Sequence, residues 1–123
     1  MIIVKTPEQI EHIKSACGVV AKTLCEIKKH IKPGVATEEL DKIVEEYVLG
    51  QGAELAFKGY RGYKYASCLS VNNEVVHGLP DERVLKDGDI IGVDVGAKVA
   101  GYYGDAAYTF AVGEVAAETL RLL

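Results

Sequence analysis

Apolar residues recur at helical spacing in two stretches at the start of the chain. The first stretch follows Thr6, which opens the capping-box sequence TPEQ with a proline in the first helical position. Pro33-Gly34 ends this helix, and a second helix begins at Thr37 and ends at Gly50. Each apolar stripe predicts packing against a core. The first stripe consists of Ile10, Ile13, Cys17, Val20, Ala21, Leu24, Ile27 and Ile31.

After Gly52 the pattern changes to short apolar runs separated by turn residues, which is typical of strands. We expect a strand near Ala66–Val71 and a short strand at Val75-Val76. Two longer strands, DIIGVDVGAKV and YYGDAAYTFAVG, follow and are joined by a tight turn. A helical pattern returns from Val115, and the chain ends inside it, so we expect residues 1–123 to be a single truncated domain.

The composition is that of one globular domain, with 49% hydrophobic and 26% charged residues among 123. The net charge of −4 argues against a nucleic-acid partner. No segment reaches the ~20 apolar residues of a membrane span, and the apolar run at MIIV is too short for a signal peptide, so we expect none. We interpret Cys17, Cys25 and Cys68 as reduced thiols of a cytoplasmic protein, with Cys17 and Cys25 buried on a helix face.

Asp94 and Asp105 are the most informative pair of residues, because they lie in the two long strands. A two-residue turn at Val99-Ala100 places the two carboxylates opposite each other. A turn at Ala100-Gly101 places Asp105 opposite Gly96, which makes the carboxylates diagonal neighbours on one face. A three-residue loop puts them on opposite faces.

Two like charges on one face of a sheet repel each other unless a shared proton or a multivalent cation compensates them. Two metal ions bridged by carboxylates are a common means of activating water for peptide hydrolysis. Gly92 and Gly96 share a face with Asp94, and Gly104 adjoins Asp105, so small residues leave room for an ion. The alternative is a pair of solvent-facing aspartates at a sheet edge, and spacing alone does not decide between the two interpretations.

Other candidate residues lie in the loops that flank the strands. His77, in VVHGLP, stands at an abrupt exit from a strand, where functional groups are often presented, although a lone histidine is more often structural. Tyr60 and Tyr63, in GYRGY, could wall an apolar pocket for an unbranched side chain such as methionine. From composition alone, ordinary loop tyrosines are the simpler interpretation.

These segments, taken in order, resemble one known family. FKGYRGYKYASCLSVNNEVVHGLP and LKDGDIIGVDVGAKVAGYYGDAAYTFAVGE are similar to the corresponding stretch of type I methionine aminopeptidases, and KTPEQIEHIKSACGVVAKTL resembles their first helix. The resemblance covers essentially the whole chain. It implies an α+β fold that is the N-terminal half of a pita-bread sandwich, a curved antiparallel sheet covered by two helices.

The resemblance also implies roles for individual residues. Asp94 and Asp105 match metal ligands, Asp105 as the bridging one, and His77 matches a residue that hydrogen-bonds the substrate and steadies the transition state. Phe57, Tyr60 and Tyr63 match the pocket for the methionine side chain, although the family often has Cys where Phe57 stands. The remaining ligands, a histidine and two glutamates from the second half, have no counterpart here.

The implied activity is metal-dependent removal of the initiator methionine from nascent proteins. Its cofactors are two divalent ions (cobalt, manganese, iron or zinc), and oxygen-rich ligation favours the first three. With an incomplete ligand set we expect the isolated chain to be inactive, and we expect its exposed sheet edge to cause self-association, whereas full-length relatives are expected to be monomers. The alternatives are a non-catalytic module that binds peptide N-termini or a protein partner and, less favoured, a prolidase-like peptidase.

Overall fold

Two helices form the first layer of the fold in a computed structural model that describes residues 1–123. Helix α1 spans Pro7–Ile27, and the predicted capping box is present: the Thr6 hydroxyl accepts the Gln9 N–H, and the Gln9 side chain accepts the Thr6 N–H. Helix α2 spans Thr37–Gly50. Both helices therefore begin where the local sequence predicts. No helix is both long enough and apolar enough to cross a membrane.

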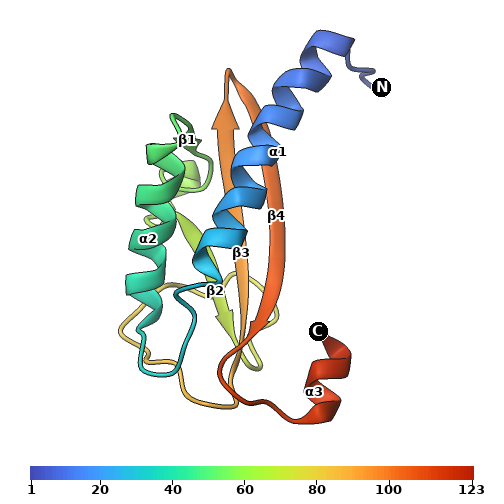
Figure 1. Cartoon of the computed structure of the whole chain (residues 1–123). Coiled ribbons are helices and arrows are strands. Elements are labelled where there is room, and N and C mark those ends of the chain that lie inside the picture. The colour runs from blue at the N-terminus through green and yellow to red at the C-terminus, as the bar shows by residue number, and fades with distance from the viewer.

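The second layer is an open antiparallel sheet of four strands (Figure 1). Strand β3 (Ile90–Val99) is central: β1 (Glu54–Leu55) and β2 (Ser67–Val71) pair with successive parts of one side, and β4 (Tyr102–Ala111) pairs with the other. A short 3₁₀ turn, η1, covers Tyr60–Gly62. The outer edge of β4 has no partner strand in this chain. The predicted strand near residues 66–71 and the two long strands are confirmed.

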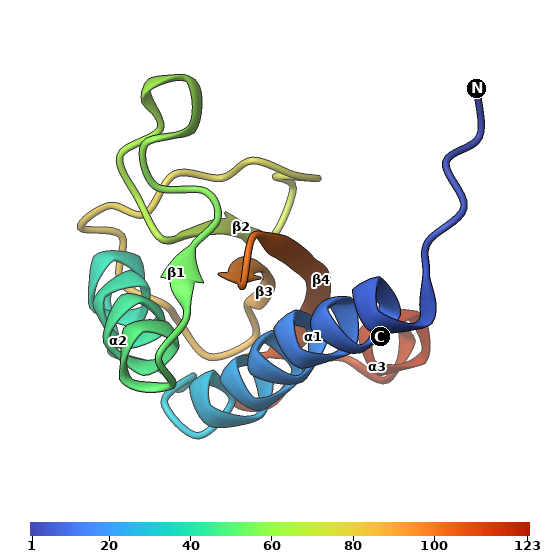
Figure 2. The same cartoon turned by 90° about the horizontal axis from the view of Figure 1, so that it is seen from above.

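Helices α1 and α2 lie against one face of this sheet, while the loop that carries η1 lies on the opposite side (Figure 2). The helices and the sheet enclose a continuous apolar core, to which β3 contributes every second residue because alternate side chains of a strand point to one face. Its largest fully buried members are Ile27, Leu40, Leu69, Leu85 and Ile91. The arrangement is α+β, as predicted, with one sheet face committed to the core and the other free for a site.

The buried face of α1 differs from the predicted stripe. Cys17 and Cys25 are exposed, so the prediction that they are buried was wrong. The buried residues are Ala16, Val19, Val20, Thr23 and Ile27. The helix is rotated because Ala16 packs at β4, where a Cβ on Gly104 would come within 2.6 Å of the Ala16 backbone. A small residue on each side permits this close approach, and the larger residues Val20, Leu24, Ile27 and Ile31 of the predicted stripe still lie in or against the core.

Two further details differ from or complete the prediction. Val75 and Val76 form no strand: they are 90% and 62% exposed in a loop with no neighbouring strand to pair with, so their β-propensity has no partner to act on. The helical pattern after Val115 becomes helix α3 at Ala117–Leu122, which buries none of its residues. The apolar face of α3 is therefore left uncovered by this chain.

Candidate metal and substrate site

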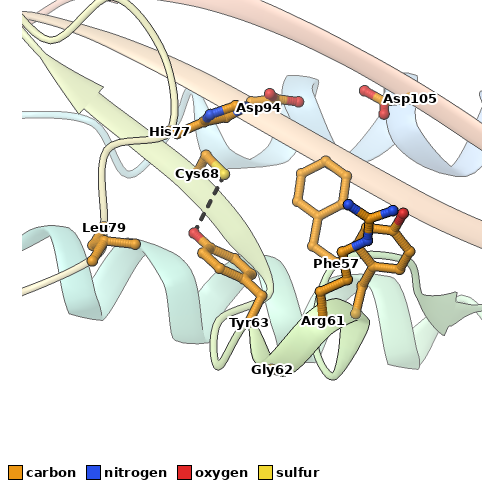
Figure 3. A pocket seen from close by; sticks show the side chains of 10 residues that line it. Phe57, Arg61, Gly62, Tyr63, Cys68, His77, Leu79, Asp94 and Asp105 are labelled. Atoms are coloured by element: carbon orange, nitrogen blue, oxygen red, sulfur yellow. Dashed lines mark hydrogen bonds between the residues drawn. The ribbon is translucent and has the colours of Figure 1, made fainter.

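A cavity of about 610 Å³ opens on the sheet face that the helices leave free. It collects all six residues for which the sequence predicts a role, from three separate segments of the chain (Figure 3). Its lining consists of Phe57, Tyr60, Arg61, Gly62, Tyr63, Cys68, His77, Leu79, Asp94 and Asp105. The loop before β2, the loop after β2 and the β3–β4 hairpin therefore converge on one space.

The hairpin between β3 and β4 decides the relation between Asp94 and Asp105. Asp105 lies opposite Gly96 and Asp94 lies opposite Ala107, which is the second of the registers considered above. The turn that sets this register has positive φ at Ala100 and Gly101, of 51° and 82°. Two central residues with positive φ are the signature of a type I′ turn, the tight hairpin that matches strand twist. The two carboxylates are therefore diagonal neighbours on the same face.

Asp94 is the electrostatically unusual member of the pair. One of its carboxylate oxygens, Oδ1, is buried and has no hydrogen-bond partner. Burial, and then the negative charge of Asp105, raise the pKa of Asp94, while the neighbouring imidazole of His77 lowers it. An unpaired buried carboxylate oxygen is costly unless a cation compensates it. The position therefore suits a cation, and Asp105, which is exposed, supplies a second carboxylate from across the ladder.

His77 is held at the cavity by an unusual backbone conformation, with a φ of +59° that non-glycine residues seldom adopt. The next residue secures it: the Gly78 N–H donates to the Ser70 hydroxyl at 3.0 Å, and the Gly78 carbonyl accepts the Leu69 N–H at 2.9 Å. A Cβ on Gly78 would overlap the carbonyl oxygen of Leu69. This contact with β2 fixes the loop and turns the His77 side chain toward the side of the cavity that holds Asp94 (Figure 3).

The aromatic wall of the cavity lies beside the carboxylates. The sequence suggested that Gly96 leaves room for an ion, but the structure does not bear this out. A Cβ there would come within 2.5 Å of the Phe57 ring, so the vacant space is filled by Phe57. Tyr63 donates its hydroxyl to the Ser67 carbonyl at 2.8 Å and accepts the Cys68 thiol at 3.3 Å. Burial is the main cause that raises the pKa values of both Tyr63 and Cys68, so both side chains are neutral near pH 7.

Sequence reasoning did not assign Cys68, Arg61 or Leu79 to the site. Cys68 lies opposite Asp94 in the β2–β3 ladder, but the pairing of β2 with β3 cannot be read from the order of the strands. Arg61 and Leu79 each stand within two residues of a predicted site residue, in GYRGY and HGLP, and that proximity was the only signal available. Arg61 places the sole cation of the cavity lining above the Tyr60 ring, at 5.3 Å from its centroid.

The donor set in this chain is small. No group of three or more His, Cys, Asp or Glu side chains is arranged to hold a metal ion. Asp94 and Asp105 provide up to four oxygens, and oxygen donors suit manganese, iron, cobalt or magnesium better than soft, thiolate-binding metals. The orphaned Oδ1 atom of Asp94 fits such an ion, while a complete coordination shell needs further ligands.

The family is established by comparison with known proteins. Residues 11–123 match the model of metallopeptidase family M24. This chain therefore belongs to metallopeptidase family M24.

Within the family, the relatives it matches are methionine aminopeptidases. It is 52% identical to methionine aminopeptidase 1 of Bacillus subtilis, over all of this chain and 50% of that protein. It is 46% identical to the methionine aminopeptidase of Clostridium acetobutylicum, over all of this chain and again 50% of that protein. The chain thus spans about half the length of the curated relatives it matches, and it resembles the N-terminal half of a type I methionine aminopeptidase, as expected from the sequence.

Solved structures support the same assignment of fold. The crystal structure of a methionine aminopeptidase from Thermotoga maritima superimposes with a TM-score of 0.95 at 50% identity, covering 99% of this chain and 49% of that one. An X-Pro aminopeptidase from the same organism superimposes with a TM-score of 0.81 at 26% identity, covering 96% of this chain and 32% of that one. The pita-bread architecture is therefore confirmed, and the identity values favour the methionine-specific branch over the proline-specific one.

Proposed function

We propose that this chain provides one half of a dinuclear methionyl aminopeptidase site, which removes the initiator methionine from nascent proteins. Residues 1–123 are then a single truncated catalytic domain. The observation that carries the proposal is the buried, unpartnered Oδ1 of Asp94, beside Asp105 in an aromatic-walled cavity. Neither a solvent-facing aspartate pair nor an ordinary salt bridge accounts for that atom. Without a cation, a proton shared with Asp105 compensates the pair, in line with the raised pKa of Asp94.

In this proposal the residues of the cavity divide into two groups. Asp94 and Asp105 hold two divalent ions, which would activate water and anchor the substrate amine when bound. His77 donates a hydrogen bond to the charge that develops on the scissile carbonyl oxygen. Phe57, Tyr60 and Tyr63 enclose an unbranched thioether side chain, because their apolar rings exclude water and contact sulfur favourably.

The isolated chain is expected to be inactive, since two carboxylates do not complete the ligand set of two ions. Purified chain with manganese or cobalt should show weak metal binding by calorimetry and no hydrolysis of a methionyl-alanine peptide. Hydrolysis that disappears in Asp105→Ala would overturn this expectation.

A hybrid protein tests the proposed activity directly. Residues 1–123 would be joined to the remaining half of the Bacillus subtilis relative, with which this chain shares 52% identity over its own length. The hybrid should hydrolyse methionyl-alanine peptides, and Asp94→Asn or Asp105→Asn should remove that activity. Asp89→Asn is the matched control, because Asp89 lies in a turn and hydrogen-bonds Asn72 away from the cavity. A folded hybrid that binds manganese but hydrolyses no methionyl peptide would refute the proposal.

The second candidate function is a module that binds peptide N-termini or a protein partner without cleaving. The absence of any group of three metal-ligating side chains favours it. In that case the hybrid would bind a methionyl peptide and leave it intact, and the isolated chain would bind the same peptide without added metal. Because the amine of the peptide would then contact Asp94 directly, Asp94→Asn should abolish binding.

A further inference from the structure

Asp41 is a buried carboxylate that the proposed chemistry does not use. It lies in α2 with only 6% of its surface exposed, on the far side of β2 from the cavity carboxylates. Its Oδ1 accepts the Ser67 N–H at 2.8 Å, the Ser67 hydroxyl at 2.7 Å and the Ala66 N–H at 3.1 Å. A carboxylate that accepts three donors at the first residues of a strand fixes the point at which that strand begins.

The same residue, Ser67, connects Asp41 to the cavity wall. While the Ser67 N–H and hydroxyl point to Asp41, the Ser67 carbonyl accepts the Tyr63 hydroxyl at 2.8 Å. The Tyr63 oxygen in turn accepts the Cys68 thiol at 3.3 Å. One continuous set of hydrogen bonds therefore runs from helix α2, through the backbone of β2, to two side chains that line the cavity.

This set of bonds determines which surface the wall presents to a ligand. The polar atoms of Tyr63 and Cys68 are bonded to each other and to Ser67, so the ring face and the sulfur remain for contact. An aromatic face beside a polarisable sulfur suits a thioether and offers little to a polar side chain. If β2 began elsewhere, the Tyr63 hydroxyl would lose its acceptor and enter the cavity as an unpaired polar group.

We propose that Asp41 is the positioning residue for this pocket wall: acting through Ser67, it orients Tyr63 and Cys68 so that the pocket accepts an apolar thioether side chain. The proposal rests on the proposed function for the nature of the ligand. The positioning itself is a property of the chain and can be measured without a substrate. Asp41 does not line the cavity, and its influence passes through one residue of β2, Ser67.

The rate at which the Cys68 thiol is chemically modified shows whether Tyr63 and Cys68 are held in place. In a Cys17→Ser, Cys25→Ser parent, Cys68 is the only thiol, and it is 7% exposed. The measurement is the rate of its modification by methyl methanethiosulfonate, a reagent about the size of the methionine terminus. Asp41→Asn keeps the shape and can leave its amide oxygen on the three donors, but it removes the negative charge and turns its NH2 group toward the Ala66 N–H. Because the Asp41 charge also helps to raise the Cys68 pKa, the rates compared are those of the fully formed thiolate, taken from the pH dependence of modification. This thiolate rate should rise by about tenfold or more, because a charge-assisted bond network no longer opposes local opening.

Thr37→Val is the matched control. Thr37 is also buried in α2, and its hydroxyl exchanges hydrogen bonds with Asp81, remote from Ser67. Its loss should lower the urea midpoint while leaving the modification rate of Cys68 in the folded protein unchanged. Equal acceleration by Thr37→Val and Asp41→Asn would overturn the proposal, and so would a folded Asp41→Asn protein with the parental rate.

A second readout follows Tyr63 itself. With tyrosine labelled at the ring carbon that carries the hydroxyl, the Tyr63 carbon signal is assigned by its absence in Tyr63→Phe. Asp41→Asn should move this signal toward those of exposed tyrosines, and Thr37→Val should not. If Asp41→Asn does not fold, Ser67→Ala decides the question: it removes one of the three donors and should accelerate Cys68 modification, and an unchanged rate would refute the proposal.

An experiment with added ligand distinguishes the positioning role of Asp41 from the proposed methionine pocket. Methionine amide should slow Cys68 modification in the parent, alanine amide should not, and Asp41→Asn should lose the protection. If methionine amide gives no protection while Asp41→Asn still accelerates modification, the positioning role stands and the methionine pocket fails. If Asp41→Asn retains full protection by methionine amide, the positioning role fails and the pocket stands.

Discussion

Cys68 of β2 lies directly opposite Asp94 of β3, so a neutral thiol and an uncompensated carboxylate share one face of the sheet. The thiol donates to Tyr63 and not to Asp94, which leaves the carboxylate oxygen without a partner. The carboxylate therefore remains available for a cation, and the thiol belongs to the apolar wall.

The first prediction concerns Asp94→Asn in the absence of metal. The pKa of Asp94 is raised in the folded protein, so the stability linked to this group is full below the unfolded pKa of about 3.9 and is lost as the pH rises through the folded pKa. Asp94→Asn should therefore be more stable than the parent near pH 7, by about 1 kcal/mol or less after solvent screening, and equal to it near pH 3. Urea titrations at both pH values measure this difference.

Asp89→Asn provides a control of opposite sign. Hydrogen bonds from the Asn72 amide and the Lys86 N–H lower the pKa of Asp89, so its contribution is present near pH 7 and is lost as the pH falls. Asp89→Asn should be less stable than the parent near pH 7, and the two should converge in acid. A destabilised Asp94→Asn protein near pH 7, measured with a chelator present, would contradict the account of the orphaned oxygen.

The second prediction concerns the contact between Gly96 and Phe57. Gly96→Ala places a methyl group 2.5 Å from the Phe57 ring and 2.9 Å from the Ala56 Cβ, so the ring must move. We expect a loss of about 1–3 kcal/mol in the free energy of unfolding, as for other overpacked sites. Gly92→Ala is the control, because its new methyl group meets nothing closer than 3.7 Å. Equal urea midpoints for the two variants would show that Phe57 does not occupy this space.

The third prediction concerns the backbone that presents His77. Gly78→Ala would place a methyl group on the carbonyl oxygen of Leu69, and since that atom belongs to β2, relief requires the loop to shift. We expect about 1–3 kcal/mol of destabilisation and a changed NMR environment for the His77 ring. Gly18→Ala, in an open position of α1, should instead stabilise by about 0.5–1 kcal/mol. An unperturbed His77 signal in Gly78→Ala would count against the role of this contact.

The fourth prediction concerns the unpaired edge of β4. This ten-residue strand carries a single charged residue, Asp105, and its Tyr103 and Tyr108 are 58% and 55% exposed. Long edges with few charges tend to associate. Sedimentation of the isolated chain should show concentration-dependent association that Tyr108→Lys reduces and Leu49→Lys, on an exposed part of α2, does not. A compact monomer at high concentration would show that the edge is protected in solution.

The sequence predicted the helices and strands of this fold better than the strand register and the packing of the helices. Capping at Thr6 and the hairpin between β3 and β4 depend on local chemistry, and both could be predicted. The choice of register was left open, although Gly101 at the second central position of a tight turn favours the type I′ geometry that the hairpin adopts. The rotation of α1 could not be predicted, because it depends on a contact between Ala16 and Gly104, residues distant in the sequence.

In the candidate site, too, features of the local sequence could be predicted, and contacts between distant residues could not. The spacing of Asp94 and Asp105 left the metal interpretation open, and the family resemblance assigned roles to these two residues and to His77. Their gathering in one cavity is observed. Cys68 and Asp41 were missed, because the importance of each comes from the strand or backbone group across from it. The roles of the predicted residues as ligands and substrate contacts remain predictions, to be tested by the hybrid protein.

Helix α1 lies against β4 so closely at Gly104 that no methyl group fits between their backbones, and Asp105 is the next residue along the strand. Consequently, a single peptide unit separates Gly104, which faces the helix layer, from Asp105, which faces the cavity. We expect a larger side chain at the fully buried Ala16 to push the helix away from Gly104, and so to disturb the strand that carries Asp105 as well as the core.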